Sequence, residues 1–86
     1  MTESHAEQVD FSALILGFSS AALHYLGLAP ALGKGPTVNL ALAKQNIEII
    51  KMLQEKTKGN LSPEEVKLVQ QLLTDLQVKW VEASRP

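Results

Sequence analysis

A stretch without any charged side chain, from Phe11 to Gly33, constrains this chain more than any other feature. Its apolar residues recur at helical spacing and predict a helix over residues 11–28. A helix without a charged face is normally covered on more than one side, and an 86-residue chain has few other elements that can cover it. We therefore expect a second copy of the protein to bury part of this helix.

The expected first helix has two unlike faces. One face carries large side chains at three- and four-residue spacing and should pack against the core. Its members are Phe11, Leu14, Ile15, Phe18, Ala22, Tyr25 and Leu26. The opposite face consists mainly of small residues, which allow a second backbone to approach closely. This face is the candidate oligomer interface, formed by Ala13, Gly17, Ser20, Ala21 and His24.

The same stretch leaves open an alternative, a membrane-associated protein with residues 11–28 inserted. Its length is sufficient for a bilayer, but its serines and the His24-Tyr25 pair lower its hydropathy to a borderline value. A cleaved signal peptide is not expected, because the residues before the stretch are acidic whereas a signal peptide begins with a basic region. Membrane insertion is therefore kept as an alternative to self-association.

Two further helices are expected to form an antiparallel hairpin. Glycines and prolines within residues 27–36 should close the first helix and form a linker. The second helix should span residues 39–58, because the Asn39 side chain can cap its first turn. The third should span residues 62–83, because Ser62-Pro63-Glu64-Glu65 combines a hydroxyl cap, a proline at the first helical position and a capping glutamate.

These elements predict an all-α protein with one helical domain, which oligomerisation completes. The domain covers residues 11–83, between a flexible polar leader at 1–10 and a short tail at 84–86. A chain of this size buries only about 60 to 65% of the surface that it exposes when unfolded, so a partner or self-association would add needed stability.

The turn between the second and third helices is a candidate hairpin corner and partner contact, formed by Lys56, Lys58, Gly59, Asn60 and Leu61. Gly59 is placed to end the second helix in a left-handed conformation, and Leu61 to pack at the start of the third. The corner is either purely structural or presents two lysines to an acidic partner. Trp80 also has two interpretations, a cap on the core or an anchor for a partner.

Composition argues against several classes of function. The chain has no cysteine, so it has no disulfide framework or thiolate metal site, and this favours a cytoplasmic location. Eight Lys and Arg residues against nine Asp and Glu residues leave no basic surplus for nucleic acid. Neither of the two histidines lies at metal-ligand or catalytic spacing from suitable neighbours within an ordered element. We expect no catalytic residue, metal or cofactor, and a protein that is not an enzyme.

Residues 40–48 (LALAKQNIE) and 52–61 (MLQEKTKGNL), followed by Glu64-Glu65, resemble a family of short bacterial proteins catalogued only as a domain of unknown function. The resemblance covers nearly the whole chain. The sequence departs from the usual family pattern at Glu48, where the family has Asp, and at Gln77, where it has Arg. The resemblance implies a bacterial origin and a small all-helical protein, and it supplies no functional residues.

Together these features predict a small interaction or scaffold module that self-associates through its first helix. Its partner is expected to be a second copy, or another protein, and not nucleic acid. Besides the membrane-associated alternative, a third interpretation is a ligand carrier or enzyme with a site shared between subunits around His24 and Tyr25.

Overall fold

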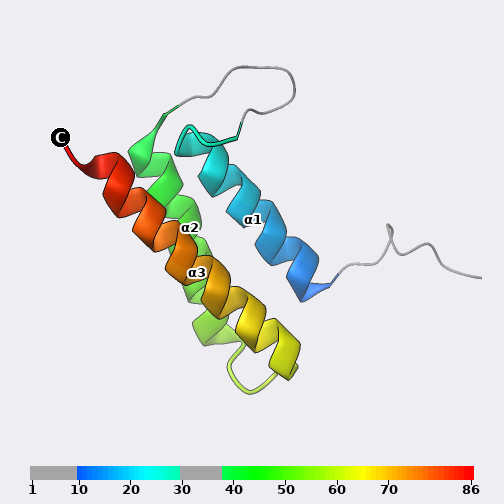
Figure 1. Cartoon of the computed structure of the whole chain (residues 1–86). Coiled ribbons are helices and arrows are strands. Elements are labelled where there is room, and N and C mark those ends of the chain that lie inside the picture. Colours follow the sequence, from blue (N-terminus) through cyan, green and yellow to red (C-terminus); the bar gives the residue numbers. More distant parts are fainter. Residues whose placement is uncertain (1–9, 30–37) are drawn as a thin grey trace, which may run out of the picture.

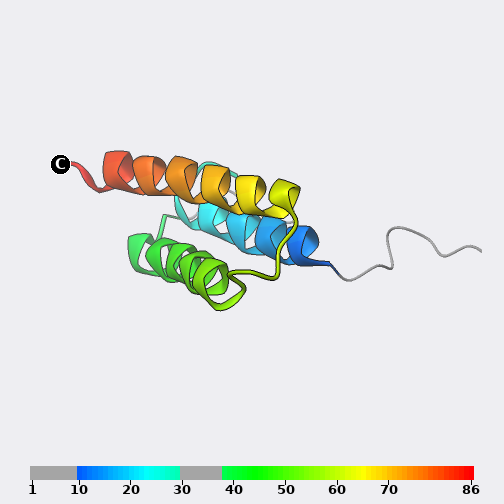
Figure 2. The same ribbon diagram turned by 90° about the horizontal axis from the view of Figure 1, so that it is seen from below.

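The computed structural model describes residues 10–29 and 38–86, which form three α-helices. Helix α1 spans Phe11–Tyr25, α2 spans Leu40–Lys56 and α3 spans Pro63–Ser84. Helices α2 and α3 form an antiparallel hairpin, and α1 lies along both of them (Figure 1). A view turned by 90° shows the three helices side by side (Figure 2).

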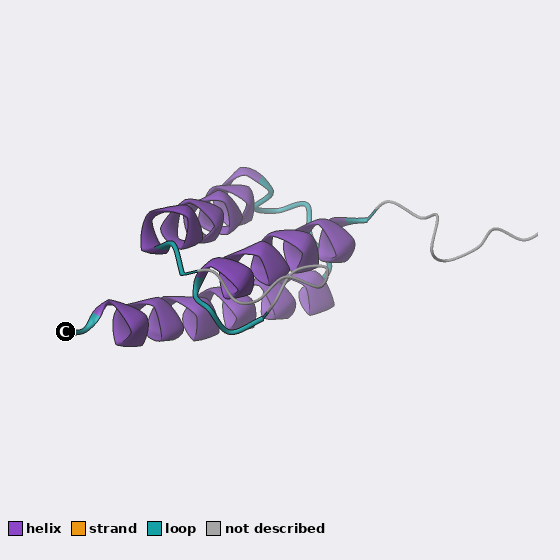
Figure 3. Ribbon diagram, turned by 90° about the horizontal axis from the view of Figure 1, so that it is seen from above, coloured by secondary structure: helices purple, strands orange, loops and turns teal. Residues whose placement is uncertain are grey.

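Within the described residues the regular elements are helices alone (Figure 3). The predicted all-α class, the three helices and the hairpin are therefore confirmed. The expectation that oligomerisation completes the fold stays a prediction, because the structure contains a single chain.

Helix α1 begins at a capped end. The Asp10 carboxylate accepts a hydrogen bond from the backbone N–H of Ala13 at 2.8 Å, and aspartate is among the residues preferred at this position. Asp10 is the last residue of the predicted polar leader, and in the structure its side chain caps α1. The remaining leader residues, 1–9, lie outside the described residues.

Helix α1 ends at Tyr25, three residues before the approximate boundary predicted at residue 28. Gly27 adopts a left-handed φ of 81°. The N–H of Gly27 donates to the His24 carbonyl at 3.0 Å, and the N–H of Leu28 donates to the Leu23 carbonyl at 2.9 Å. This pair of bonds is the Schellman motif, which ends a helix where a left-handed residue follows its last turn.

The two ends of the α1–α2 connection are held together. The N–H of Asn39 donates to the carbonyl of the last α1 residue at 2.7 Å, and Leu26 and Val38 form an isolated antiparallel bridge. A Cβ atom on Gly27 would lie 2.8 Å from Cγ2 of Val38. Most of the predicted linker falls in residues 30–37, which lie outside the described residues.

Helices α2 and α3 begin at the caps that the sequence predicts. The Asn39 side chain accepts a bond from a first-turn N–H at 3.0 Å. The Ser62 hydroxyl accepts from the N–H of Glu65 at 3.1 Å, and the Glu65 carboxylate accepts from the N–H of Ser62 at 2.8 Å, which completes a capping box. The predicted ends of both helices agree with the observed ones to within two residues.

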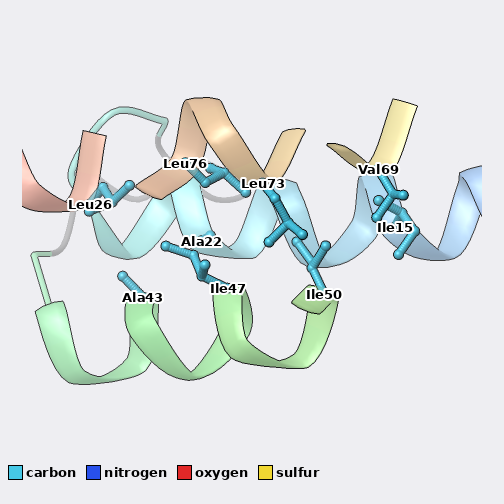
Figure 4. Close-up of a cluster of buried hydrophobic side chains, with 9 residues drawn as sticks. All are labelled: Ile15, Ala22, Leu26, Ala43, Ile47, Ile50, Val69, Leu73 and Leu76. Carbon is cyan, nitrogen blue, oxygen red and sulfur yellow. The ribbon is translucent and has the colours of Figure 1, made fainter. Parts of the chain in front are cut away.

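The core lies where the three helices meet, and Figure 4 shows its side chains pointing into this space. Nine apolar side chains are buried there: Ile15, Ala22, Leu26, Ala43, Ile47, Ile50, Val69, Leu73 and Leu76. Ser19 is buried beside them with 5% of its surface exposed. The buried positions of α1 and its cap therefore follow a narrow line through residues 15, 19, 22 and 26.

One residue of the predicted α1 core face does not belong to the core. Leu14 is 46% exposed. Consecutive helical residues are about 100° apart, so with Ile15 at the core Leu14 points to the edge of the helix. Phe11, Phe18 and Tyr25 pack against the margin of the core and are half-buried, as expected for the flanks of this face.

Candidate functional site

The side of α1 that faces away from α2 and α3 is the candidate site, and Figure 1 shows it uncovered in the single chain. We call it the outer face of α1. Its members are Ala13, Leu14, Leu16, Gly17, Ser20, Ala21 and His24. All five predicted interface residues lie on it: Ala13, Gly17 and Ser20 are exposed, whereas Ala21 and His24 are half-buried.

Two leucines of the outer face are absent from the predicted interface. Leu14 is 46% exposed and Leu16 is 48% exposed. Leu14 was assigned to the core and Leu16 to neither face. Both are immediate neighbours of Ile15, and helical geometry turns such neighbours about 100° away from the core direction. If the predicted core face is centred on Ile15 and not on the whole apolar stripe, helical geometry predicts that Leu14 and Leu16 both lie outside the core.

A shallow groove runs between α1 and α2 beside Leu14. It is lined by Ala13, Leu14, Gly17, Phe18 and Ala21 from α1 and by Asn46 from α2. The Asn46 amide donates to the Leu42 carbonyl at 2.9 Å, so this side chain already has a hydrogen-bond partner within its own helix. None of the six lining residues is charged. The groove therefore continues the uncharged character of the outer face onto α2.

Gly17 lies in this groove without a structural requirement from its own chain. A Cβ atom placed on Gly17 would meet nothing within 4 Å. The single chain therefore has room for a side chain here, in contrast to Gly27, where the added atom would press on Val38.

His24 is held by the turn that follows α1. Its Nδ1 lies 3.1 Å from the carbonyl oxygen of Ala29, and its ring centroid lies 5.0 Å from that of Tyr25 at an interplanar angle of 59°. Because a carbonyl only accepts, we assign the proton to Nδ1, which leaves Nε2 as the second functional nitrogen. These contacts explain both rings as local structure. Within the described residues, no three His, Cys, Asp or Glu side chains gather as a possible metal site.

The predicted corner residues all lie in or beside the α2–α3 turn: Lys56, Lys58, Gly59, Asn60 and Leu61. Gly59 has the expected left-handed conformation, with φ at 88°. The N–H of Asn60 donates to the carbonyl of Thr57 at 2.9 Å, and Leu61 packs against the core. The structural interpretation of the corner thus accounts for the turn residues, while the two lysines are exposed to solvent.

Trp80 joins α3 to the beginning of α2. Its Nε1–H donates to the carbonyl oxygen of Leu40 at 2.9 Å. The ammonium of Lys44 lies 5.2 Å from the ring centroid, within the range of a cation–π contact. Trp80 is half-buried and packs against the core. These contacts agree with the interpretation of Trp80 as a core cap; a role as partner anchor stays a prediction.

The fold and this surface define a small all-α protein, a three-helix bundle in which one helix carries no acidic or basic residue except His24. The chain belongs to the family described as Domain of unknown function (DUF1844), whose model matches residues 8–82. The resemblance to a family catalogued only as a domain of unknown function is thereby confirmed. Comparisons with curated proteins and with solved structures found no match. Among the helices of the described residues, none has the length and apolar character needed to cross a membrane.

Proposed function

We propose that the protein is a small interaction module that self-associates through the outer face of α1. The observation that carries the proposal is an exposed helix face without any Asp, Glu, Lys or Arg side chain. A helix on the surface of a single soluble domain normally places charged residues on its outer side. Helix α2 does so with Lys44, Glu48 and Lys51, all of which are exposed. The outer face of α1 has the composition of a surface that another protein covers.

Gly17 supports the same proposal. Glycine in the middle of a helix is less stable than alanine by about 0.5–1 kcal/mol. The protein tolerates this cost at a position where its own chain leaves room for a side chain. A second helix packed closely against the outer face supplies a physical reason, because a missing side chain lets two backbones approach.

The proposal includes a non-enzymatic role and a cytoplasmic location. The hydrogen bond between His24 and the Ala29 carbonyl supports a non-enzymatic role, because it explains the most reactive side chain of the outer face as part of the local structure. The absence of cysteine from the sequence supports a cytoplasmic location. The proposed partner is a second copy, and another protein is the alternative occupant of the same face.

Size-exclusion chromatography with light scattering on detergent-free protein tests the proposal. We expect a discrete dimer or larger species. Gly17→Leu should shift the mass to that of the monomer, because the new side chain blocks close approach while meeting nothing in its own chain. Gln71→Leu is the matched control: it adds the same side chain at an exposed position of α3 and should leave the mass unchanged.

Each other outcome has a defined meaning. A monomeric mass for the unsubstituted protein at high concentration would overturn the proposal. An assembly that survives Gly17→Leu would place the interface elsewhere. Recovery only in detergent, together with partition into liposomes, would replace self-association by the membrane-associated alternative.

A further inference from the structure

An acidic and a basic side chain lie at equal distances from Gly17: Asp10, the cap that precedes the outer face of α1, and His24 at its end. Asp10 lies seven residues before Gly17, and His24 lies seven residues after it. Seven residues make almost two helical turns, with a drift of only about 20°, so the three positions share one line along the helix. Ala13 and Ala21 lie four residues to either side of Gly17 on the same face. The spacing of these positions is therefore symmetric about Gly17, with an acidic residue at one end and a basic residue at the other.

The two end groups each keep one polar atom available for a partner. The Oδ1 atom of Asp10 accepts from the N–H of Ala13, which leaves the second carboxylate oxygen on an exposed side chain. The Nδ1 atom of His24 is engaged by the Ala29 carbonyl, which leaves Nε2 for a partner; in the imidazolium form this nitrogen donates to a carboxylate.

We propose that a second copy docks on this face with its α1 antiparallel, around a twofold axis at Gly17. This inference rests on the proposed function and adds the orientation and the contacts of the interface. In the antiparallel pair, Asp10 of each copy lies opposite the partner's His24. A parallel pair would instead bring the two Asp10 carboxylates together, and like charges across an interface are unfavourable.

The shape of the outer face also suits this arrangement. A twofold interface requires one patch to complement itself, so protruding and recessed parts must occur together on it. The exposed leucines Leu14 and Leu16 protrude on either side of the line of small residues, and the groove between α1 and α2 is recessed at Gly17. In the antiparallel pair Leu14 lies at the level of the partner's Ser20, which is small, and Leu16 lies at the level of the partner's Phe18.

Disulfide formation between introduced cysteines tests the relative orientation of the two α1 helices, because the natural chain contains no cysteine that could interfere. Ala13→Cys protein carrying a mass tag is mixed with untagged Ala21→Cys protein and oxidised gently. The mixed disulfide should predominate, because these two positions face each other in the antiparallel pair and a disulfide needs Cβ atoms about 3.5–4.5 Å apart. Gly17→Cys alone should link to itself on the axis. Gln71→Cys on α3 is the control and should not link.

The outcomes separate this inference from the proposed function. If Ala13→Cys links mainly to itself and forms little mixed product, the pair is parallel; the inference is overturned and self-association through α1 stands. If no position on the outer face links and the mass is monomeric, both proposals are overturned.

A charge test examines the contact between Asp10 and the partner's His24. Asp10→Asn removes the charge and keeps the cap, since Asn caps a helix as well as Asp does. We expect the dimer dissociation constant to rise about two- to thirtyfold, which is the range for two exposed ion pairs. Asp75→Asn removes the carboxylate that pairs with Lys79 on α3 and should not change this constant.

His24→Gln completes a double-mutant cycle with Asp10→Asn. If the two groups touch across the interface, His24→Gln should weaken the dimer in the natural background and have little further effect when Asp10 is already Asn. Fully additive effects of the two substitutions would show that these residues do not meet, and would overturn the proposed register.

Discussion

The glycines at positions 17, 27 and 59 differ in backbone conformation and in the space available for a side chain. Gly17 lies inside α1 in open space, where a side chain would fit. Gly59 has a left-handed φ of 88°, but a Cβ atom placed there would meet nothing within 4 Å. Gly27 combines a left-handed φ of 81° with the close approach of Val38. Only at Gly27 do backbone conformation and packing both require glycine.

Substitution of Gly27 should therefore be the most damaging of the alanine replacements at these three glycines. Gly27→Ala should lower the free energy of unfolding by about 1–3 kcal/mol, because alanine is strained at positive φ and its Cβ would crowd Val38. Gly59→Ala should cost less, since it meets the backbone strain alone. Urea denaturation followed by circular dichroism measures both.

A second substitution isolates the contribution of the contact. Val38 is 65% exposed, so Val38→Ala alone should change the stability by less than about 0.5 kcal/mol. In the Gly27→Ala background it should restore part of the loss, because it removes the Cγ2 atom that the new Cβ meets. Equal costs for Gly27→Ala and Gly59→Ala would show that Val38 contributes nothing.

At the scale of elements, α2 and α3 are joined by a polar contact near each end of the hairpin. Near the turn, the Gln54 amide donates to the Gln70 side-chain oxygen at 3.0 Å. At the open end of the hairpin, Trp80 donates to the carbonyl of Leu40. Helix α1 adds its buried apolar line to this pair. The two hairpin helices thus share both the apolar core and these polar contacts, whereas α1 packs on them through its apolar line.

Trp80→Phe tests how far the open end of the hairpin depends on the indole. The loss of one hydrogen bond and of some buried area should lower the free energy of unfolding by about 1–2 kcal/mol. Circular dichroism is the required readout, because Trp80 is the one tryptophan of the chain. Val81→Ala, at a half-exposed neighbouring position, is the control and should have little effect. A Phe variant with normal stability but weakened assembly would favour the interpretation of Trp80 as a partner anchor.

At the scale of the whole molecule, the small size of the chain links stability to assembly. An 86-residue protein buries a modest share of its surface, so its free energy of unfolding has a thin margin. If the outer face of α1 is covered by a second copy, association adds to the stability of each copy by mass action. Folding and assembly should then respond together to protein concentration.

The melting temperature should therefore rise with protein concentration. For a dimer of this size, a hundredfold increase should raise the midpoint by roughly 5–10 °C. In Gly17→Leu the midpoint should become independent of concentration, because that variant is expected to be monomeric. A midpoint of the natural protein that stays constant over this range would contradict a coupling between folding and self-association.

The sequence by itself determined where α2 and α3 begin and end. The caps at Asn39 and Ser62 and the left-handed residue Gly59 act on groups within four residues of themselves, so local chemistry is sufficient to read them. The small-residue face of α1 also follows from helical spacing alone. The start of α1 at residue 11 is predicted correctly, but the cap at Asp10 is not, because Asp10 ends a polar run that the sequence gives no reason to join to the helix.

Only the tertiary structure decided how the helices are rotated toward one another. That rotation places Ser19 in the core and leaves Leu14 at the surface, although hydrophobicity alone predicts that Leu14 is buried and Ser19 is exposed. It also brings Trp80 to the carbonyl of Leu40, 40 residues earlier in the chain. Such contacts depend on the best joint packing of three helices, which maximises total apolar burial and does not follow the hydropathy of any single position.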